Sequence, residues 1–274
     1  MRSALVLSGV VGALAITVGG PATGVGPRAA WAHDESTSGS WTADVTPDPA
    51  AAEVTQFLPT TSGAAVARAR SVTTAWGGFD GAGRTPVLSI GTEVRIVRRL
   101  ALLVGAGYDQ SGAASPTLRP RVGARVQVLA QEASGLDLGV SLAFRQDRFT
   151  SEDGMIQGGV ALARSFGATS LVGNVIYAQD GEGDDYEGEL RLAALHRVRG
   201  GLHLGVEGRY MRLLDSKDPH RQEHGTPSME ATAGPIVAYM AGSWLLAVEA
   251  GYSARRTDRL QNGLAMLGGV GAAF

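Results

Sequence analysis

The chain ends in the stretch LAMLGGVGAAF (residues 264–274), in which every second residue counted back from Phe274 is apolar or glycine. A period of two places alternate side chains on one face, as in a β-strand that has one face against an apolar environment. The same pattern recurs upstream roughly eleven times, separated by gaps rich in turn residues. The sequence therefore predicts an all-β fold made of many short strands.

Twelve segments qualify as strands, and they occupy residues 66–78, 87–97, 101–110, 117–131, 136–146, 155–164, 170–179, 186–197, 202–212, 228–241, 244–255 and 263–274. The first is the weakest, because neither of its faces is cleanly apolar. The connections alternate between short turns, such as 98–99 and 242–243, and longer polar loops, such as 147–154 and 213–227. Alternating short turns and long loops are typical of bacterial membrane barrels, in which the short turns are periplasmic and the longer loops extracellular.

One face of these strands is apolar and the opposite face carries charged side chains. An arginine that faces lipid near the membrane midplane costs about 2 to 4 kcal/mol, so several of them cannot point outward. We therefore expect the charged face to line the lumen of a barrel. The predicted lumen-lining residues are Glu93, Arg95, Arg121, Arg125, Asp137, Arg145, Glu189, Arg191, Glu207, Arg209 and Glu249. Small inward residues on the last strands, Gly269 and Gly271 among them, are expected to leave room on one side.

Aromatic residues on the apolar face fall at the two ends of the strands. Those at the long-loop ends are Trp76, Tyr108, Phe144, Tyr177, Tyr186, Tyr210 and Tyr252, and those at the short-turn ends are Phe166, Tyr239, Trp244 and Phe274. Two such rings are typical of the aromatic girdles at membrane interfaces. Pro120 and Pro235 lie inside predicted strands, where each removes a ladder donor, so we expect bulges or strand ends there.

The N-terminal region predicts secretion. Arg2 precedes an apolar run over residues 4–18, and Ala30-Trp31-Ala32 fits a cleavage site, so residues 1–32 are predicted to be a cleaved signal peptide. Residues 33–63 lack strand periodicity and are predicted to be a periplasmic leader or a short plug, before a barrel over residues 64–274. The chain has no cysteine, which excludes lipidation on cysteine, and its net charge of −2 gives no reason to expect a nucleic-acid partner.

The terminal strand, with Leu264, Met266, Val270 and a final Phe274, resembles that of Gram-negative outer-membrane β-barrels. The resemblance covers about residues 66–274 and is to the class, not to one member. With the strand pattern, it predicts a twelve-stranded antiparallel transmembrane β-barrel in the bacterial outer membrane, surrounded by lipid and lipopolysaccharide. It also implies that the barrel-assembly machinery recognises the strand that ends in Phe274.

Function follows less directly from the sequence. A barrel of twelve strands is intermediate between eight-stranded barrels filled by side chains and sixteen-stranded open channels. The favoured hypothesis is a narrow porin-like channel for small polar solutes, in which Arg121, Arg125, Glu93 and Glu207 guide ions. The alternative is a non-conducting structural or surface barrel whose luminal charges pair with each other.

A second alternative is an outer-membrane lipid or peptide hydrolase, since His220 and His224 lie near acids in the loop 213–227. The sequence contains no Gly-x-Ser-x-Gly motif, and polar loop tips carry such residues routinely. The acidic loop 180–187 lacks the glycine and glutamate positions of a calcium-binding loop. We therefore predict no catalytic residue, no metal ligand, no cofactor and no enzymatic activity.

Overall fold

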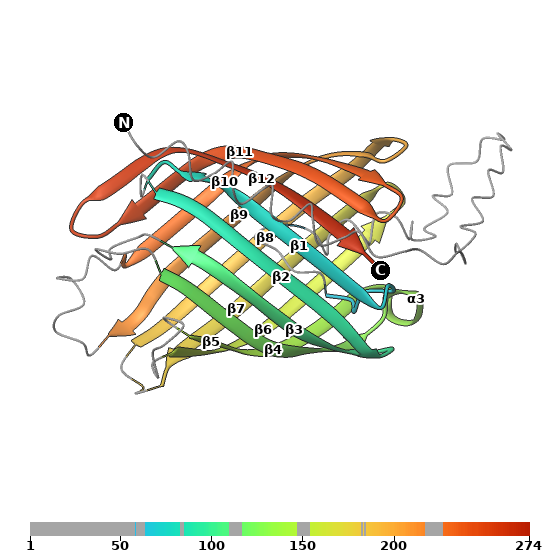
Figure 1. The fold of residues 1–274 in the computed structure, drawn as a ribbon, viewed down its shortest axis with the longest axis horizontal. Helices are drawn as coiled ribbons and strands as arrows, with labels where there is room; N and C mark the ends of the chain where they lie inside the picture. The colour runs from blue at the N-terminus through green and yellow to red at the C-terminus, as the bar shows by residue number, and fades with distance from the viewer. Residues whose placement is uncertain are drawn as a thin grey trace, which may run out of the picture. The chain divides into compact units, whose positions relative to one another are not determined.

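The computed structural model describes residues 58, 64–82, 85–109, 117–146, 154–181, 183, 185–216 and 227–274. Twelve antiparallel strands close into one barrel, as the sequence predicted (Figure 1). The strands are β1 (Ser71–Asp80), β2 (Thr85–Val97), β3 (Leu100–Asp109), β4 (Thr117–Leu129), β5 (Asp137–Gln146), β6 (Gly154–Phe166), β7 (Thr169–Asp180), β8 (Asp185–Arg199), β9 (Leu202–Ser216), β10 (Met229–Ala241), β11 (Trp244–Arg256) and β12 (Leu260–Ala273). One helical turn, α3 (Gln131–Ser134), joins β4 to β5. Among the described residues, no helix is long and apolar enough to cross a membrane.

The last strand closes the barrel against the first. β12 pairs with β1 in antiparallel register from Val72 opposite Ala273 to Phe79 opposite Met266. At the end of this ladder, Ser71 N donates to the carbonyl of Phe274 at 3.0 Å, and Phe274 N donates to the carbonyl of Ser71 at 2.8 Å. Every other strand pairs with its neighbours along the chain. The C-terminal aromatic residue therefore lies at the seam where the sheet becomes a cylinder without edges.

The outer surface carries the apolar face of the strands. Leu264 is 79% exposed and Leu142 62%, and exposed aliphatic residues recur at alternate positions of most strands. A continuous apolar surface of this kind matches lipid rather than water. Trp244 and Phe274 pack edge to face at the short-turn end, with ring centroids 6.5 Å apart. The structure thus confirms the predicted lipid-facing belt.

Trp76 corrects the predicted aromatic girdle. Its side chain is only 4% exposed and points into the lumen, not toward lipid. The reason is the register of β1, which places Trp76 opposite Gly269 of β12. A Cβ atom at Gly269 would overlap the indole ring, so the glycine provides the space that the ring fills. The room predicted beside the small residues of β12 is therefore partly occupied by Trp76.

Neither strand proline lies at a bulge, although a bulge was one of the two outcomes expected from the sequence. Pro120 pairs with Ala106 in an unbroken register, next to Arg121, where pairing with β5 begins. Pro235 pairs with Val206 of β9 in an unbroken register, whereas the pairing of β10 with β11 skips Gly234 and Pro235. The register shifts lie elsewhere, between residues 95 and 97, 127 and 129, 186 and 187, and 197 and 199. The missing ladder donors are tolerated without an inserted residue.

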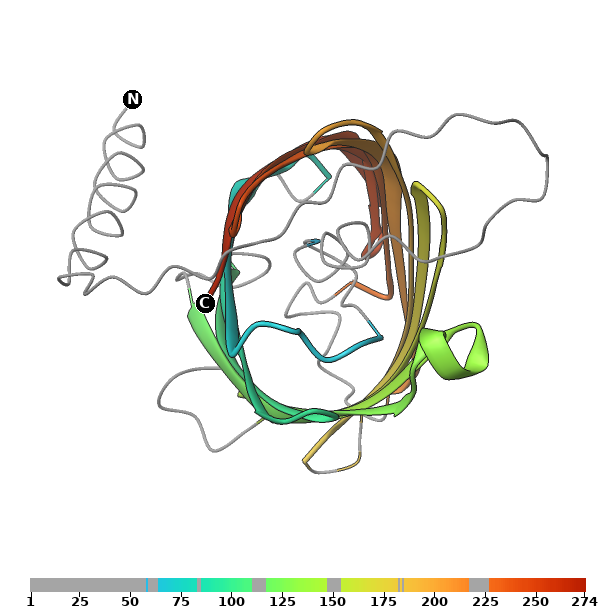
Figure 2. The same cartoon turned by 90° about the vertical axis from the view of Figure 1, so that its right-hand side faces the viewer.

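Residues 64–70, which we call the inner segment, run across the lumen before β1 begins (Figure 2). The predicted first strand is therefore wrong over residues 66–70, since β1 starts at Ser71. Val66 N donates to Gln127 Oε1 at 3.3 Å, and Ala67 N donates to Glu93 Oε1 at 3.1 Å. The wall thus supplies acceptors for backbone donors that have no ladder partner.

Apolar packing also holds the inner segment. Ala67 joins a buried cluster with inward-facing wall residues, and Leu58 belongs to the same cluster; its other members are Val72, Trp76, Ala193, Leu195, Ile236, Ala238, Leu245 and Ala247. These wall side chains would face water in an empty lumen, so covering them stabilises the packed arrangement. The predicted signal peptide and, apart from Leu58, the predicted leader or plug over 33–63 lie outside the described residues.

Candidate functional site: the charged lumen

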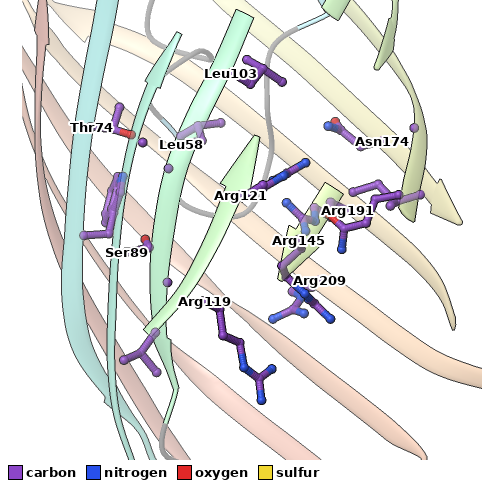
Figure 3. Close-up of a pocket in the computed structure, with 18 of the residues that line it drawn as sticks. Leu58, Thr74, Ser89, Leu103, Arg119, Arg121, Arg145, Asn174, Arg191 and Arg209 are labelled. Carbon is purple, nitrogen blue, oxygen red and sulfur yellow. The ribbon is translucent and has the colours of Figure 1, made fainter. Parts of the chain in front are cut away.

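The barrel encloses a cavity of about 570 Å³. Leu58 and Trp76 contribute to its apolar lining. Arginines of β4, β5, β8 and β9 also line it, among them Arg121, Arg145, Arg191 and Arg209 (Figure 3). Six of the predicted lumen residues line this cavity: Glu93, Arg121, Arg125, Arg145, Arg191 and Arg209. Arg255 also lines it and was not singled out from the sequence. Its inward position could have been inferred, because Arg255 lies an even number of residues from Glu249 on β11 and so shares its face.

The remaining predicted residues lie around the cavity. Glu189 sits between two of the lining arginines. Glu207 and Glu249 are each 2% exposed and lie on the inward-facing side of β9 and β11 respectively. Asp137 accepts hydrogen bonds from Gln127 Nε2 and the backbone N of Gln131, both at 2.9 Å, so it stabilises the turn that contains α3.

Arg95 lies at the short-turn end of β2. Its backbone N donates to the carbonyl of Arg70 at 2.8 Å, which joins the wall to the last residue of the inner segment. Its side chain is not among the groups that line the cavity. Arg95 is therefore placed beside the junction between the inner segment and β1.

Glu93 and Arg125 form an ion pair that fixes the inner segment. Arg125 Nη1 lies 2.8 Å from Glu93 Oε2, and the two side chains are 7% and 11% exposed respectively. Glu93 uses its other oxygen, Oε1, to accept from Ala67 N. Both carboxylate oxygens are thus engaged in holding structure. The ion-guiding role predicted for these two residues stays a prediction, and the structure adds a structural role.

A second carboxylate, Glu189, binds two arginines. Arg191 Nη2 lies 2.7 Å from Glu189 Oε2, and Arg209 Nε donates to Glu189 Oε1. Arg191 and Arg209 are direct neighbours across the β8–β9 ladder. Like charges in that position destabilise a sheet. Glu189 offsets this repulsion by contacting both guanidinium groups.

A second pair of opposed arginines, on β4 and β5, has a different environment. Arg121 and Arg145 are opposite each other across the β4–β5 ladder. Arg145 Nη2 donates to the thioether sulfur of Met155 at 2.9 Å, which is a weak acceptor. Arg121 Nε is buried and has no hydrogen-bond partner. Figure 3 shows Arg121, Arg145 and Arg191 converging on one region of the cavity.

The overall charge of the lining is positive. Of the described residues, seven arginines line the cavity, against four acids. One further ion pair joins two of these lining residues, Arg255 Nη2 and Glu230 Oε1, at 2.6 Å. Arg121 lies within electrostatic range of Arg191, Arg145 and Arg125, so several positive charges gather around it.

The structure shows no metal site in the described part of the chain. No three histidine, aspartate or glutamate side chains there are grouped closely enough to hold a metal ion. His220 and His224, on which the hydrolase hypothesis rests, lie outside the described residues, as do Glu182 and Asp184 of the acidic loop.

No protein-family model matches the sequence, and no curated protein matches it. Among solved structures, a KdgM porin in complex with disordered oligogalacturonate superposes with a TM-score of 0.52 at 12% identity, over 74% of this chain and 99% of that one. A NanC porin superposes with a TM-score of 0.50 at 10% identity, over 74% of this chain and 98% of that one. The chain has the fold of outer-membrane porin barrels. At this identity the likeness concerns the fold alone.

Proposed function

We propose that the protein is a narrow, passive, porin-like channel for small polar solutes in the bacterial outer membrane. The observation that carries the proposal is the cavity of about 570 Å³ inside a closed barrel, lined by charged side chains. A structural barrel has no need for an interior space surrounded by arginines. The shared fold with two structures described as porins supports the same function.

The channel is narrow because its interior is partly filled. Trp76 and Leu58 occupy one side of the lumen, and the inner segment crosses it at the short-turn end (Figure 2). Twelve strands alone give an interior between that of a filled barrel and that of a large porin. We therefore expect solutes about the size of a monosaccharide to pass and trisaccharides to be excluded.

One observation favours the alternative of a non-conducting barrel. The inner segment is fixed by two hydrogen bonds to the wall and by the buried Glu93–Arg125 ion pair. A segment held this firmly across the lumen fits a closed scaffold as well as a constriction. Solute flux distinguishes the two functions.

Liposome swelling measures this flux. Folded protein, checked by its heat-dependent migration on a detergent gel, is reconstituted into liposomes that are diluted into arabinose or raffinose. A channel predicts swelling in arabinose and little swelling in raffinose. If arabinose enters no faster than into protein-free liposomes, the channel function is wrong and the closed barrel is correct.

The cellular location and partners belong to the same proposal. A cleaved signal peptide, residence among lipopolysaccharide and delivery by the barrel-assembly machinery would bring this fold to the outer membrane. Truncating Phe274 removes both hydrogen bonds to Ser71 at the barrel seam. We expect this truncation to reduce the amount of folded barrel in outer-membrane fractions, whereas unchanged amounts would exclude a role for Phe274 in assembly.

A further inference from the structure

The lumen contains two arginine pairs, on parts of the wall that are separated by β6 and β7. Arg121 faces Arg145 across β4 and β5, and Arg191 faces Arg209 across β8 and β9. Directly opposed like charges are unfavourable in a sheet, and their repulsion grows when water is excluded. Four guanidinium groups arranged in this way therefore require anions nearby.

The chain provides one carboxylate for the second pair. Glu189 contacts Arg191 and Arg209 with separate oxygens, so both of its oxygens are engaged. Arg121 lies close enough to Glu189 to feel its charge, but three arginines oppose this attraction at Arg121. The electrostatic field at Arg121 is therefore that of a cationic cluster.

Arg121 also has unused hydrogen-bonding capacity. Its Nε group is buried without a partner, and the side chain lines the cavity beside Arg145 and Arg191 (Figure 3). A buried donor without an acceptor costs free energy that a bound acceptor would recover. The planar guanidinium fork matches the two oxygens of a carboxylate or of a phosphate, and such bidentate bonds are among the strongest in proteins.

We infer that Arg121, with Arg145 and Arg191 beside it, forms an anion-binding site inside the lumen that takes solutes carrying a carboxylate or phosphate group. That the site acts on solutes during transport rests on the proposed channel function. That the site binds anions is independent of the channel function. A neutral solute of the same size cannot supply the acceptor charge, so the site selects by charge as well as by size.

Isothermal titration calorimetry on the folded protein in detergent tests binding directly. The probes are glucuronate and inorganic phosphate, with glucose as the neutral control. We expect at least one of the two anions to bind and glucose to give no heat of binding; the anion that binds identifies the preferred oxyanion. Binding of neither anion, or equal binding of glucose and glucuronate, would overturn the inference.

The variant Arg121→Gln removes the positive charge and the planar guanidinium group that can bind two oxygens at once. We expect its affinity for the anion to fall by roughly tenfold or more, as for the loss of a charge-assisted hydrogen bond. Arg98→Gln removes one positive charge from an exposed two-residue turn outside the cavity, and its affinity should equal that of the wild type. Equal affinities for Arg121→Gln and Arg98→Gln would refute the site. If Arg121→Gln does not fold, Arg145→Gln takes its place.

Planar-bilayer recordings in a potassium chloride gradient separate this inference from the channel function. We expect a reversal potential on the anion-selective side that moves toward cation selectivity in Arg121→Gln and not in Arg98→Gln. Anion binding without any conductance would refute the channel and leave the site standing. Conductance without anion binding or anion selectivity would refute the site and leave the channel standing.

Discussion

The buried ion pair between Glu93 and Arg125 provides a sharp test of how the inner segment is held. Glu93→Gln keeps an acceptor for Ala67 N but removes the charge that compensates Arg125, whose side chain is only 7% exposed. Removing one partner of a buried pair costs about 3 to 5 kcal/mol, because the other charge stays buried without compensation. We expect the free energy of unfolding, measured by urea titration in lipid vesicles, to fall by about 3 kcal/mol.

The exposed pair between Arg68 and Glu132 is the matched control. Its atoms are 3.2 Å apart and both side chains are 63% exposed. A pair in this environment contributes about 0 to 1 kcal/mol, so Glu132→Gln should change stability by less than about 1 kcal/mol. A double-mutant cycle with Arg125→Met isolates the coupling in the buried pair. Equal losses for Glu93→Gln and Glu132→Gln would refute the reasoning, as would a buried-pair coupling below about 1 kcal/mol.

Two further substitutions test the packing of the wall. Gly269→Val should lower the free energy of unfolding in urea by about 1 to 3 kcal/mol, because its side chain would overlap Trp76, whereas Gly268→Val meets open space and should be tolerated; equal losses would contradict the placement of Trp76. Leu142→Arg on the lipid-facing belt should cost about 2 to 4 kcal/mol in the same titration, and Ser141→Arg on the luminal side clearly less. An equal cost at positions 141 and 142 would show that the two faces are assigned wrongly.

The fold could be predicted from the sequence because each strand has one face toward lipid and the other toward the lumen. Lipid on one side and the lumen on the other impose a period of two, as in the exposed Leu142 and its luminal neighbour Ser141. Pairing between strands adjacent in the chain leaves little topological choice. The cost of turning arginine toward lipid then decides which face is inside.

The inner segment could not be predicted in the same way. It has no periodicity, and its contacts are made with residues far along the chain, such as Val66 N with Gln127 Oε1. Whether Trp76 faces lipid or the lumen depends on how β1 pairs with β12, the first and last strands of the barrel. Local patterns carry no information on such a pairing.

The sequence predicted which side chains of the candidate site face the lumen, but not which of them pair with each other. Strand parity identified Arg121, Arg145, Arg191 and Arg209 as inward-facing residues. Which of them is neutralised depends on the cross-strand register, since Glu189 on β8 reaches Arg209 on β9. Parity alone treats Arg125 and Arg121 alike, although Arg125 is paired with Glu93 and Arg121 Nε has no hydrogen-bond partner.

Single-channel recording tests the central claim, that this barrel encloses a narrow conducting lumen, most directly. Folded protein in a planar bilayer, recorded over a range of voltages and salt concentrations, should give small, discrete and reproducible conductance steps. Their size should increase when the constriction is reduced by Trp76→Ala. Absence of any conductance step from protein that is folded and inserted would contradict the claim.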